Sequence, residues 1–238
     1  MSKRFIAFSV LAFGLLVLMT GTAWADSVPI VNASFESYNP LTTPCTPQYG
    51  ANCTYNANNG IPGWNVTNGG SFQPSLITQT NPYNGMFYSI PDGSIVAYTV
   101  GGTISQTLAD LASSDGIYTM SVFVGSRSDR NAGSFVLSLD TILNGAITGT
   151  VCSVSGNAMN FAPGTWVDET CSGTPTTSGN LFLNFRQLSG QLDVDNASLN
   201  YSPTSVPEPG SASMLGFGAL FLLGVFFFAR KKQISLIA

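Results

Sequence analysis

The stretch at residues 116–125, GIYTMSVFVG, has the apolar pattern from which the fold class is predicted. Large apolar side chains stand at every second position of it, namely Tyr118, Met120, Val122 and Val124. Alternation with a period of two is typical of a β-strand with one buried face. The same alternation returns at 134–142 (SFVLSLDTI) and at 180–188 (NLFLNFRQL).

Further strands are expected on either side of these three, at 94–100, 102–108 and 191–201. The segments are separated by turn-forming pieces such as PDG, SSDG, LNG and LSG. Eight or more short strands at a spacing of about ten residues predict an all-β, jelly-roll β-sandwich. Only LADLASSD, at 108–115, favours a helix, of one or two turns.

The first 25 residues are typical of an export signal. Lys3 and Arg4 precede an apolar stretch at 5–19, and Ala23 and Ala25 form an A-x-A cleavage site. We therefore expect a signal peptide at 1–25 and a mature chain that begins at Asp26.

The other end predicts a membrane span. Residues 211–229 hold nineteen residues without a charge, and a helix of that length is about 28 Å long. Three bases, at 230–232, follow it and favour a cytoplasmic tail at 230–238. A linker at 203–210 joins the span to a sandwich domain at 26–202.

The composition of this domain excludes several kinds of chemistry. Three arginines (Arg127, Arg130 and Arg186) stand against eleven acids, which gives a net charge of −8. Binding of nucleic acid needs bases to neutralise phosphates, so nucleic acid is not an expected partner. The chain has no histidine, which removes Ser-His-Asp and Cys-His nucleophiles and His-ligated zinc.

Four cysteines lie in the exported domain, and an even number in an oxidising compartment favours disulfides. Three connectivities are possible. The local one, Cys45–Cys53 with Cys152–Cys171, is favoured because each pair closes a loop or a hairpin. A four-cysteine zinc site is the alternative, but no C-x-x-C spacing supports it.

The tail VPEPGSASMLGFGALFLLGVFFFARKK, at 206–232, resembles a PEP-CTERM sorting signal. Its motif consists of Val206, Pro207, Glu208 and Pro209. The resemblance implies a Gram-negative bacterium that makes exopolysaccharide. It further implies processing near Pro-Glu-Pro by an exosortase, a membrane protease, and release to the cell surface or the extracellular matrix.

The domain resembles the galactose-binding-like carbohydrate-binding modules in VNASFES (31–37), GIPGW (60–64) and LDVDNASL (192–199). In that family the equivalents of Glu36 and Asp195 bind a structural calcium ion. Calcium prefers six to eight oxygen ligands, so backbone carbonyls would complete the set. Asp193 is an alternative to Asp195, since both point the same way in a regular strand.

For a glycan ligand, aromatic and charged loop residues are the candidates. These are Tyr83, Phe87 and Tyr88 in NPYNGMFYS, and Arg127 and Asp129 in GSRSDR. Trp64 and Trp166 are expected in the core.

Together these observations predict a non-enzymatic surface or matrix protein that associates with exopolysaccharide or another glycan. A purely structural matrix protein without a sugar pocket is the alternative. A remote alternative is a glycosidase that uses Glu36 and Glu169, the two glutamates of the domain, as its carboxylate pair.

Overall fold

The structure is a computed structural model of the full chain. It describes residues 25–45, 53–56, 60–78, 85–129 and 132–204, together with 218 and 221. Contacts divide the chain into two units, one of Ala25–Ser202 and one of Met1–Trp24 with Pro203–Ala238.

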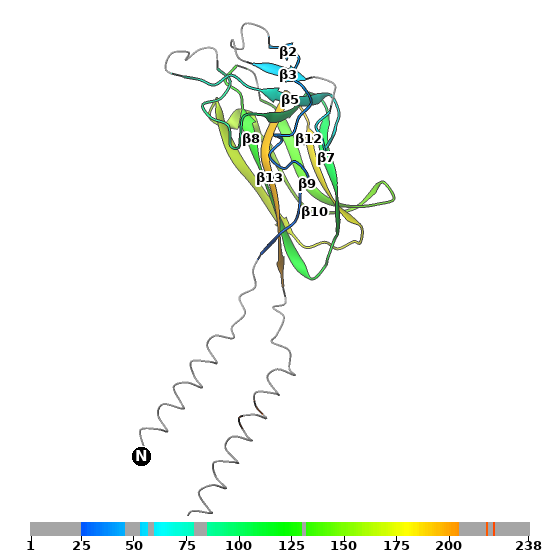
Figure 1. The fold of residues 1–238 in the computed structure, drawn as a ribbon. Coiled ribbons are helices and arrows are strands. Elements are labelled where there is room, and N and C mark those ends of the chain that lie inside the picture. Colours follow the sequence, from blue (N-terminus) through cyan, green and yellow to red (C-terminus); the bar gives the residue numbers. More distant parts are fainter. Residues whose placement is uncertain are drawn as a thin grey trace, which may run out of the picture. The chain divides into compact units, whose positions relative to one another are not determined.

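The part of the chain described is built almost entirely from antiparallel strands (Figure 1). Their bounds are β1 Asp26–Ser27, β2 Thr43–Pro44, β3 Thr54–Asn56, β4 Asn65–Val66, β5 Gly69–Gln73, β6 Val96–Thr99, β7 Thr103–Leu111, β8 Gly116–Ser126, β9 Ser134–Leu143, β10 Ala146–Asn157, β11 Thr165–Gly173, β12 Asn180–Gln187 and β13 Leu192–Pro203. A 3₁₀ turn, η2, covers Ala158–Asn160.

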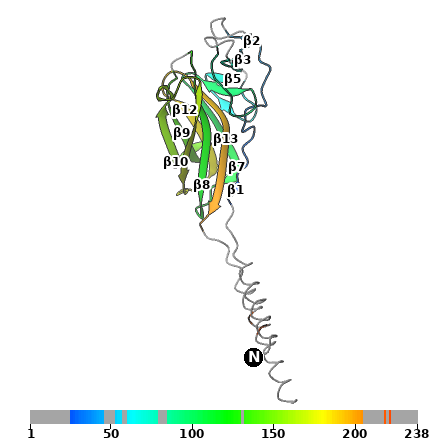
Figure 2. The same ribbon diagram turned by 90° about the vertical axis from the view of Figure 1, so that its left-hand side faces the viewer.

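The described strands form two sheets that stack face to face (Figure 2). One runs in the order β11-β8-β13-β6-β5-β3-β2, with β1 paired to β13, and the other in the order β10-β9-β12-β7-β4. This is an all-β, two-sheet sandwich, and the predicted fold class is confirmed at that level.

The core lies between the sheets and follows the predicted alternation. Met120, Val122 and Val124 of β8 face Leu137 and Leu139 of β9 across it, and all of these side chains are fully buried. Phe185 of β12 meets the ring of Trp64 at 5.6 Å, and Phe35 lies 5.0 Å from the same indole. Trp64 is therefore a core residue, as predicted.

The predicted helical turn at 108–115 is wrong. β7 continues as a strand to Leu111, because β12 pairs with it as far as Asn180 opposite Leu111. Cross-strand hydrogen bonds and the burial of Leu108 outweigh the weak helix propensity of this segment.

A second, smaller apolar cluster covers the outer face of the eight-stranded sheet. Its members are Cys53, Phe72, Met86, Phe87 and Val96. Val96 belongs to this cluster, whereas Ala97, the next residue of β6, belongs to the main core. Because neighbouring residues of a strand point to opposite faces, the second cluster lies outside the sandwich.

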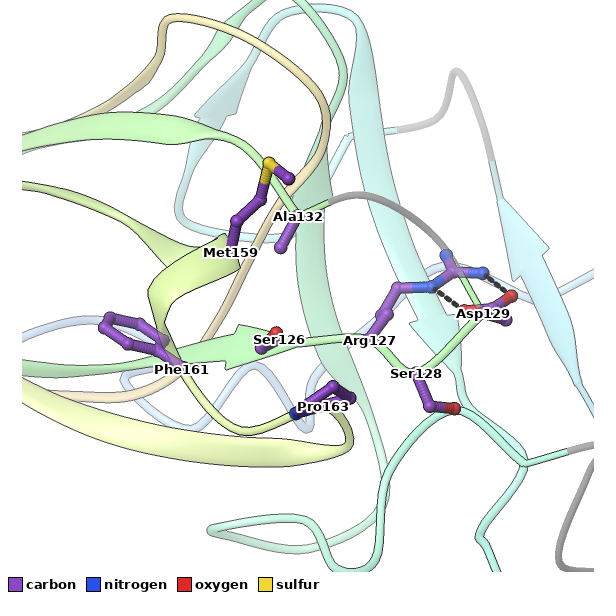
Figure 3. Close-up of a pocket in the computed structure, with 8 residues that line it drawn as sticks. All are labelled: Ser126, Arg127, Ser128, Asp129, Ala132, Met159, Phe161 and Pro163. Carbon is purple, nitrogen blue, oxygen red and sulfur yellow. Dashed lines mark hydrogen bonds and ion pairs between the residues drawn. The ribbon is translucent and has the colours of Figure 1, made fainter.

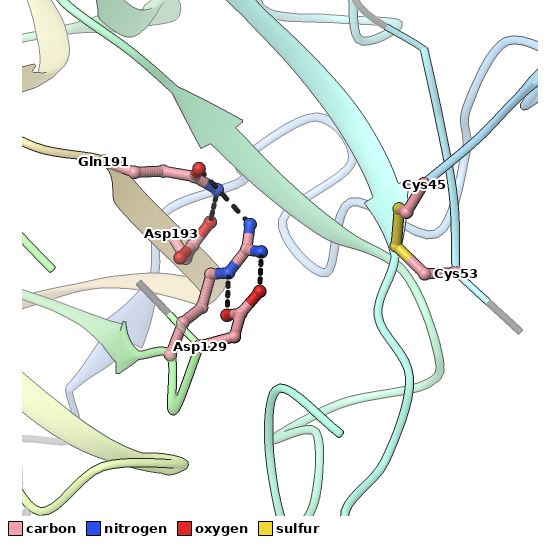
Figure 4. The surroundings of a disulfide bond; sticks show 6 residues. Cys45, Cys53, Asp129, Gln191 and Asp193 are labelled. Carbon is pink, nitrogen blue, oxygen red and sulfur yellow. Dashed lines mark hydrogen bonds and ion pairs between the residues drawn. A yellow bond between two sulfur atoms is a disulfide. The ribbon is translucent and has the colours of Figure 1, made fainter. Parts of the chain in front are cut away.

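Two disulfides are present, in the local pairing favoured from the sequence. Cys152 lies in β10 and Cys171 in β11, so their bond joins an edge of one sheet to an edge of the other. Cys45 and Cys53 close the β2–β3 segment at one end of the sandwich (Figure 4).

Most of the predicted targeting features lie outside the described residues. These are signal-peptide residues 1–24 with Ala23, the motif Val206, Pro207, Glu208 and Pro209, almost all of the expected span at 211–229, and the tail at 230–238. Among the residues that are described, no helix has the length and apolar character needed to cross a bilayer.

Candidate active site

A buried ion pair stands where β8 ends. Arg127 directly follows the last residue of β8, and its Nε and Nη2 donate to Oδ1 and Oδ2 of Asp129 at 2.8 and 2.6 Å. The Arg127 side chain is only 7% exposed. A bidentate pair of this kind fixes the guanidinium plane and neutralises its charge locally.

The pair extends inward to a second carboxyl group. Nη1 of Arg127 donates to Oε1 of Gln191 at 3.3 Å, and Nε2 of Gln191 donates to Oδ1 of Asp193 at 2.7 Å (Figure 4). Asp193 lies in β13 and is 1% exposed. The Gln191 amide thus connects the guanidinium to a desolvated carboxyl, and we call these four residues the Arg127 network.

Aromatic rings surround the Arg127 network. Tyr98 of β6 is the cross-strand partner of Asp193, and its ring lies 5.5 Å from Phe72 and 6.5 Å from Tyr55. Burial raises the pKa of Tyr98 to about 12, helped by Tyr55 and Asp193 and opposed by Arg127. The Tyr98 phenol therefore keeps its proton at neutral pH.

A hollow of about 440 Å³ opens beside the ion pair (Figure 3). Its described lining consists of Ser126, Arg127, Ser128, Asp129, Ala132, Met159, Phe161 and Pro163. These residues come from the end of β8, the approach to β9, η2 and the turn before β11. The hollow thus reaches the outer end of the Arg127 network, and Asp193 lies at the inner end.

The predicted calcium ligands lie in a different place. Oε1 of Glu36 accepts hydrogen bonds from the backbone amides of Ser94 and Ile95, at 2.8 and 2.7 Å. Asp195 accepts from the amides of Asp92 and Asn196, at 3.0 and 2.8 Å. Structurally, Asp195 stands beside Glu36 and Asp193 belongs to the Arg127 network.

Burial and like charges act on Asp195. Desolvation, opposed by the two backbone hydrogen bonds and helped by the nearby carboxylates of Asp92 and Glu36, raises the pKa of this carboxyl to about 7. In the described part of the chain, no group of three or more His, Cys, Asp or Glu side chains is arranged to hold a metal. The oxygen donors suit calcium in kind, and backbone carbonyls would have to complete the number.

The aromatic candidates for a glycan ligand are dispersed. Tyr83 lies outside the described residues. Phe87 is fully buried and stacks on Trp166 at a centroid distance of 4.4 Å, so its ring is not available to a ligand. Tyr88 is 63% exposed. Of the predicted set, only Arg127 and Asp129 come together, and they do so in the hollow.

Sequence reasoning missed the partners of Arg127. Gln191 stands just before the LDVDNASL motif, and nothing in its sequence context marks it. Tyr98 was part of a predicted strand without a role. The roles of Gln191 and Tyr98 become visible only in the folded chain. There β13 pairs with β6, which places Tyr98 opposite Asp193, and the end of β8 brings Arg127 to Gln191.

The described strands define the chain as an all-β protein with a two-sheet sandwich domain. One similar structure is the CBM22-1 xylan-binding domain from Paenibacillus barcinonensis Xyn10C, with 12% identity, a TM-score of 0.41, and coverage of 63% of this chain and 92% of that one. Another is the K3 cleaved adhesin domain of Lys-gingipain from Porphyromonas gingivalis, with 11% identity, a TM-score of 0.37, and coverage of 58% and 89%. Similarity at this level defines neither a ligand nor an activity.

The chain belongs to the HpiC1-like family, described as HpiC1 cyclase, whose model matches residues 26–200. No curated protein matches the chain. Membership of a cyclase family overturns the prediction of a non-enzymatic, glycan-associating or structural matrix protein. That prediction rested on the two family resemblances and on the lack of histidine and of a second free glutamate, but carboxyl and phenol groups also transfer protons and need no imidazole.

Proposed function

We propose that the protein is a cyclase and that the Arg127 network is its catalytic centre. The match of the family model over residues 26–200 supports the reaction class. The placement in the network rests on one observation, the desolvated carboxyl of Asp193 held by a neutral amide.

The proposed reaction closes a ring by adding and removing one proton. The Asp193 carboxyl protonates one carbon of a carbon–carbon double bond, and a second π bond attacks the resulting cation to form the ring bond. The carboxylate then takes a proton from a neighbouring carbon. Atoms and charge balance without an oxidant or a leaving group, so the product is an isomer of the substrate.

The surroundings of Asp193 suit such a cation. Tyr98 is the cross-strand partner of Asp193, and an aromatic ring attracts positive charge through its π electrons. The Phe72 ring already lies 5.6 Å from the Arg127 guanidinium carbon. Arg127 does not oppose it strongly, because Asp129 neutralises the guanidinium. Shielding of Asp193 keeps water from capturing the cation.

The test uses the full chain and a lipid-soluble extract of a strain that lacks its gene, in which the substrate accumulates. Added protein is expected to convert at least one compound into an isomer of equal mass and different chromatographic retention. In D₂O the product should carry deuterium on carbon. The proposal would be contradicted if the added protein converted no compound in this extract while an extract of the parent strain was active.

We also propose that Glu36 and Asp195 hold a structural calcium ion, with Asp92 close by. The buried carboxyl of Asp195 with the like charges of Glu36 and Asp92 near it supports the proposal, because a divalent cation offsets their repulsion and the desolvation of Asp195. In this role the ion would stabilise the fold and would not take part in the ring closure.

Calcium is expected to raise the melting temperature strongly at pH 8 and weakly at pH 5. The raised pKa of about 7 means that Asp195 stabilises the fold when protonated, and this stabilisation is lost as the pH rises through 7. Calcium at about 100 times its Kd then restores about 2.7 kcal/mol, or roughly 5–10 °C. The measurement is calorimetry in metal-free and calcium-containing buffer.

Glu36→Ala should remove the calcium effect at both pH values. Asp168→Asn, at an exposed position of β11, is the control and should keep it. An equal calcium response in Glu36→Ala would refute the site.

We propose, finally, that the enzyme is exported, with exosortase processing at the Pro-Glu-Pro motif. The two disulfides are consistent with an exported protein. Mass spectrometry of the native protein should find Asp26 at its N-terminus and a C-terminus near Pro207–Pro209. A native chain that retains Met1 would refute export, and one that retains the tail to Ala238 would refute processing.

A further inference from the structure

We infer that Gln191 is a positioning residue of the proposed catalytic centre: it holds Oδ1 of Asp193 as a hydrogen-bond acceptor, so that Oδ2 is the oxygen that gives and takes the proton. Arg127 acts one step further away, because it fixes the orientation of the Gln191 amide. The use of Oδ2 in ring closure rests on the proposed cyclase function, whereas the orientation of the amide rests on the hydrogen bonds of the network.

The orientation of the Gln191 amide follows from the chemistry of its two neighbours. A guanidinium group has only N–H donors. The Oε1 acceptor of Gln191 therefore faces Nη1 of Arg127, at 3.3 Å, and the NH₂ group donates to Oδ1 of Asp193 at 2.7 Å (Figure 4). A half-turn of the amide would set its NH₂ group against the N–H groups of Arg127. Arg127 thus selects one of the two orientations.

Arg127 can fix the amide because its own guanidinium is held on two sides. Its Nε and Nη2 donate to Asp129, and its central carbon lies 5.6 Å from the centre of the Phe72 ring. The backbone of Gln191 is held too, since the Gly133 amide donates to its carbonyl at 3.2 Å. Gln191 is only 6% exposed, so water does not readily replace a lost partner of its side chain.

The consequence for Asp193 is that its two carboxyl oxygens differ. A proton on Oδ1 would face the N–H group of Gln191, so the protonated carboxyl carries its proton on Oδ2. Rotation of the carboxyl group, which would exchange the two oxygens, breaks the 2.7 Å hydrogen bond. Gln191 therefore keeps the reacting oxygen in one place, and the rate of a reaction is sensitive to such placement.

Hydrogen exchange of the Gln191 side-chain amide tests the orientation without any substrate. The full chain is labelled with ¹⁵N in its glutamine side chains, and the Gln191 signal is identified by its loss in Gln191→Met. Its amide protons should exchange with D₂O about tenfold faster, or more, in Arg127→Met than in the wild type, because the amide is then free to turn.

Gln106 is the control within the same spectrum. It is 5% exposed and lies in β7 of the other sheet, where its Nε2 donates to the carbonyls of Val31 and Gly63 at 2.9 and 2.8 Å. Its exchange should not change in Arg127→Met. If that variant does not fold because Asp129 loses its partner, Arg127→Met with Asp129→Asn removes the ion pair as a unit.

Kinetics test the positioning role. Gln191→Met should lower kcat for ring closure about 10–100-fold and leave KM within about twofold of the wild type, because the amide orients Asp193 and does not bind the substrate. Added to Asp193→Asn it should cause no further loss, since it acts through that carboxyl. Gln106→Met, the matched control, should keep the kcat of the wild type. Circular dichroism checks that each variant is folded.

The outcomes separate this inference from the cyclase proposal. If the wild type isomerises no compound, the proposed function fails, while exchange at Gln191 that depends on Arg127 still supports the orientation of the amide. The inference is overturned if Gln191 exchanges equally fast with and without Arg127. It is also overturned if an active enzyme keeps its full kcat in Gln191→Met, or if that loss adds to the loss in Asp193→Asn.

Discussion

Asp193→Asn is expected to lower the rate of ring closure by about 10²–10⁴-fold, the usual contribution of a general acid or base. Asparagine has nearly the same shape and can still accept the 2.7 Å hydrogen bond from Gln191, but it cannot give or take the proton. The measurement is the initial rate of isomer formation by mass spectrometry at a fixed protein concentration.

Asp140→Asn is the matched control for this prediction. Asp140 is also buried, at 3% exposure, but it lies in β9 of the other sheet and accepts from Ser138 and Thr150, both at 2.7 Å. It should retain activity if it folds. If Asp193→Asn were folded and fully active, the Arg127 network would not be the catalytic centre.

Removal of the Cys152–Cys171 disulfide should destabilise the sandwich by about 3 kcal/mol, because the bond closes a loop of 19 residues in the unfolded chain. For a domain of this size that corresponds to a fall in melting temperature of roughly 6–12 °C. The variant is Cys152→Ala with Cys171→Ala, compared with the wild type by calorimetry.

Cys45→Ala with Cys53→Ala is the comparison. That bond spans only 8 residues, so its removal should cost slightly less stability. Cys53 belongs to the apolar cluster that contacts Arg127 through Phe72. If the Arg127 network is the catalytic centre, the loss of the Cys45–Cys53 bond should lower activity more strongly than it lowers the melting temperature. If the variant without the Cys152–Cys171 disulfide melted at the same temperature as the wild type, the expected loss of stability would be contradicted.

The fold was predictable because it depends on local pattern. The alternation at 116–125, 134–142 and 180–188 defines which side chains are buried, and each stretch forms a strand, β8, β9 and β12, with the expected face inward. The prediction was wrong at 108–115, where pairing between β7 and β12 outweighs local preference. Propensity is a weak signal wherever tertiary contacts oppose it.

The candidate site was predictable only in part. Arg127 and Asp129 are neighbours in the sequence, so their pairing is visible in the motif GSRSDR. Gln191 lies 64 positions further along and has no sequence signal of its own. The activity class was predicted wrongly, because composition excludes imidazole chemistry but is silent on what a desolvated carboxyl can do.

Local sequence pattern was sufficient to predict the alternation of buried and exposed residues and the acidic charge of the domain, and it favoured the local pairing of the cysteines, since each depends on residues close together in the chain. The contacts between polar residues depend on the tertiary structure. Pairing of β13 with β6 placed Asp193 opposite Tyr98, and the end of β8 brought Arg127 to Gln191. Such contacts join distant segments, and the free energy that selects them is spread over the whole sandwich core.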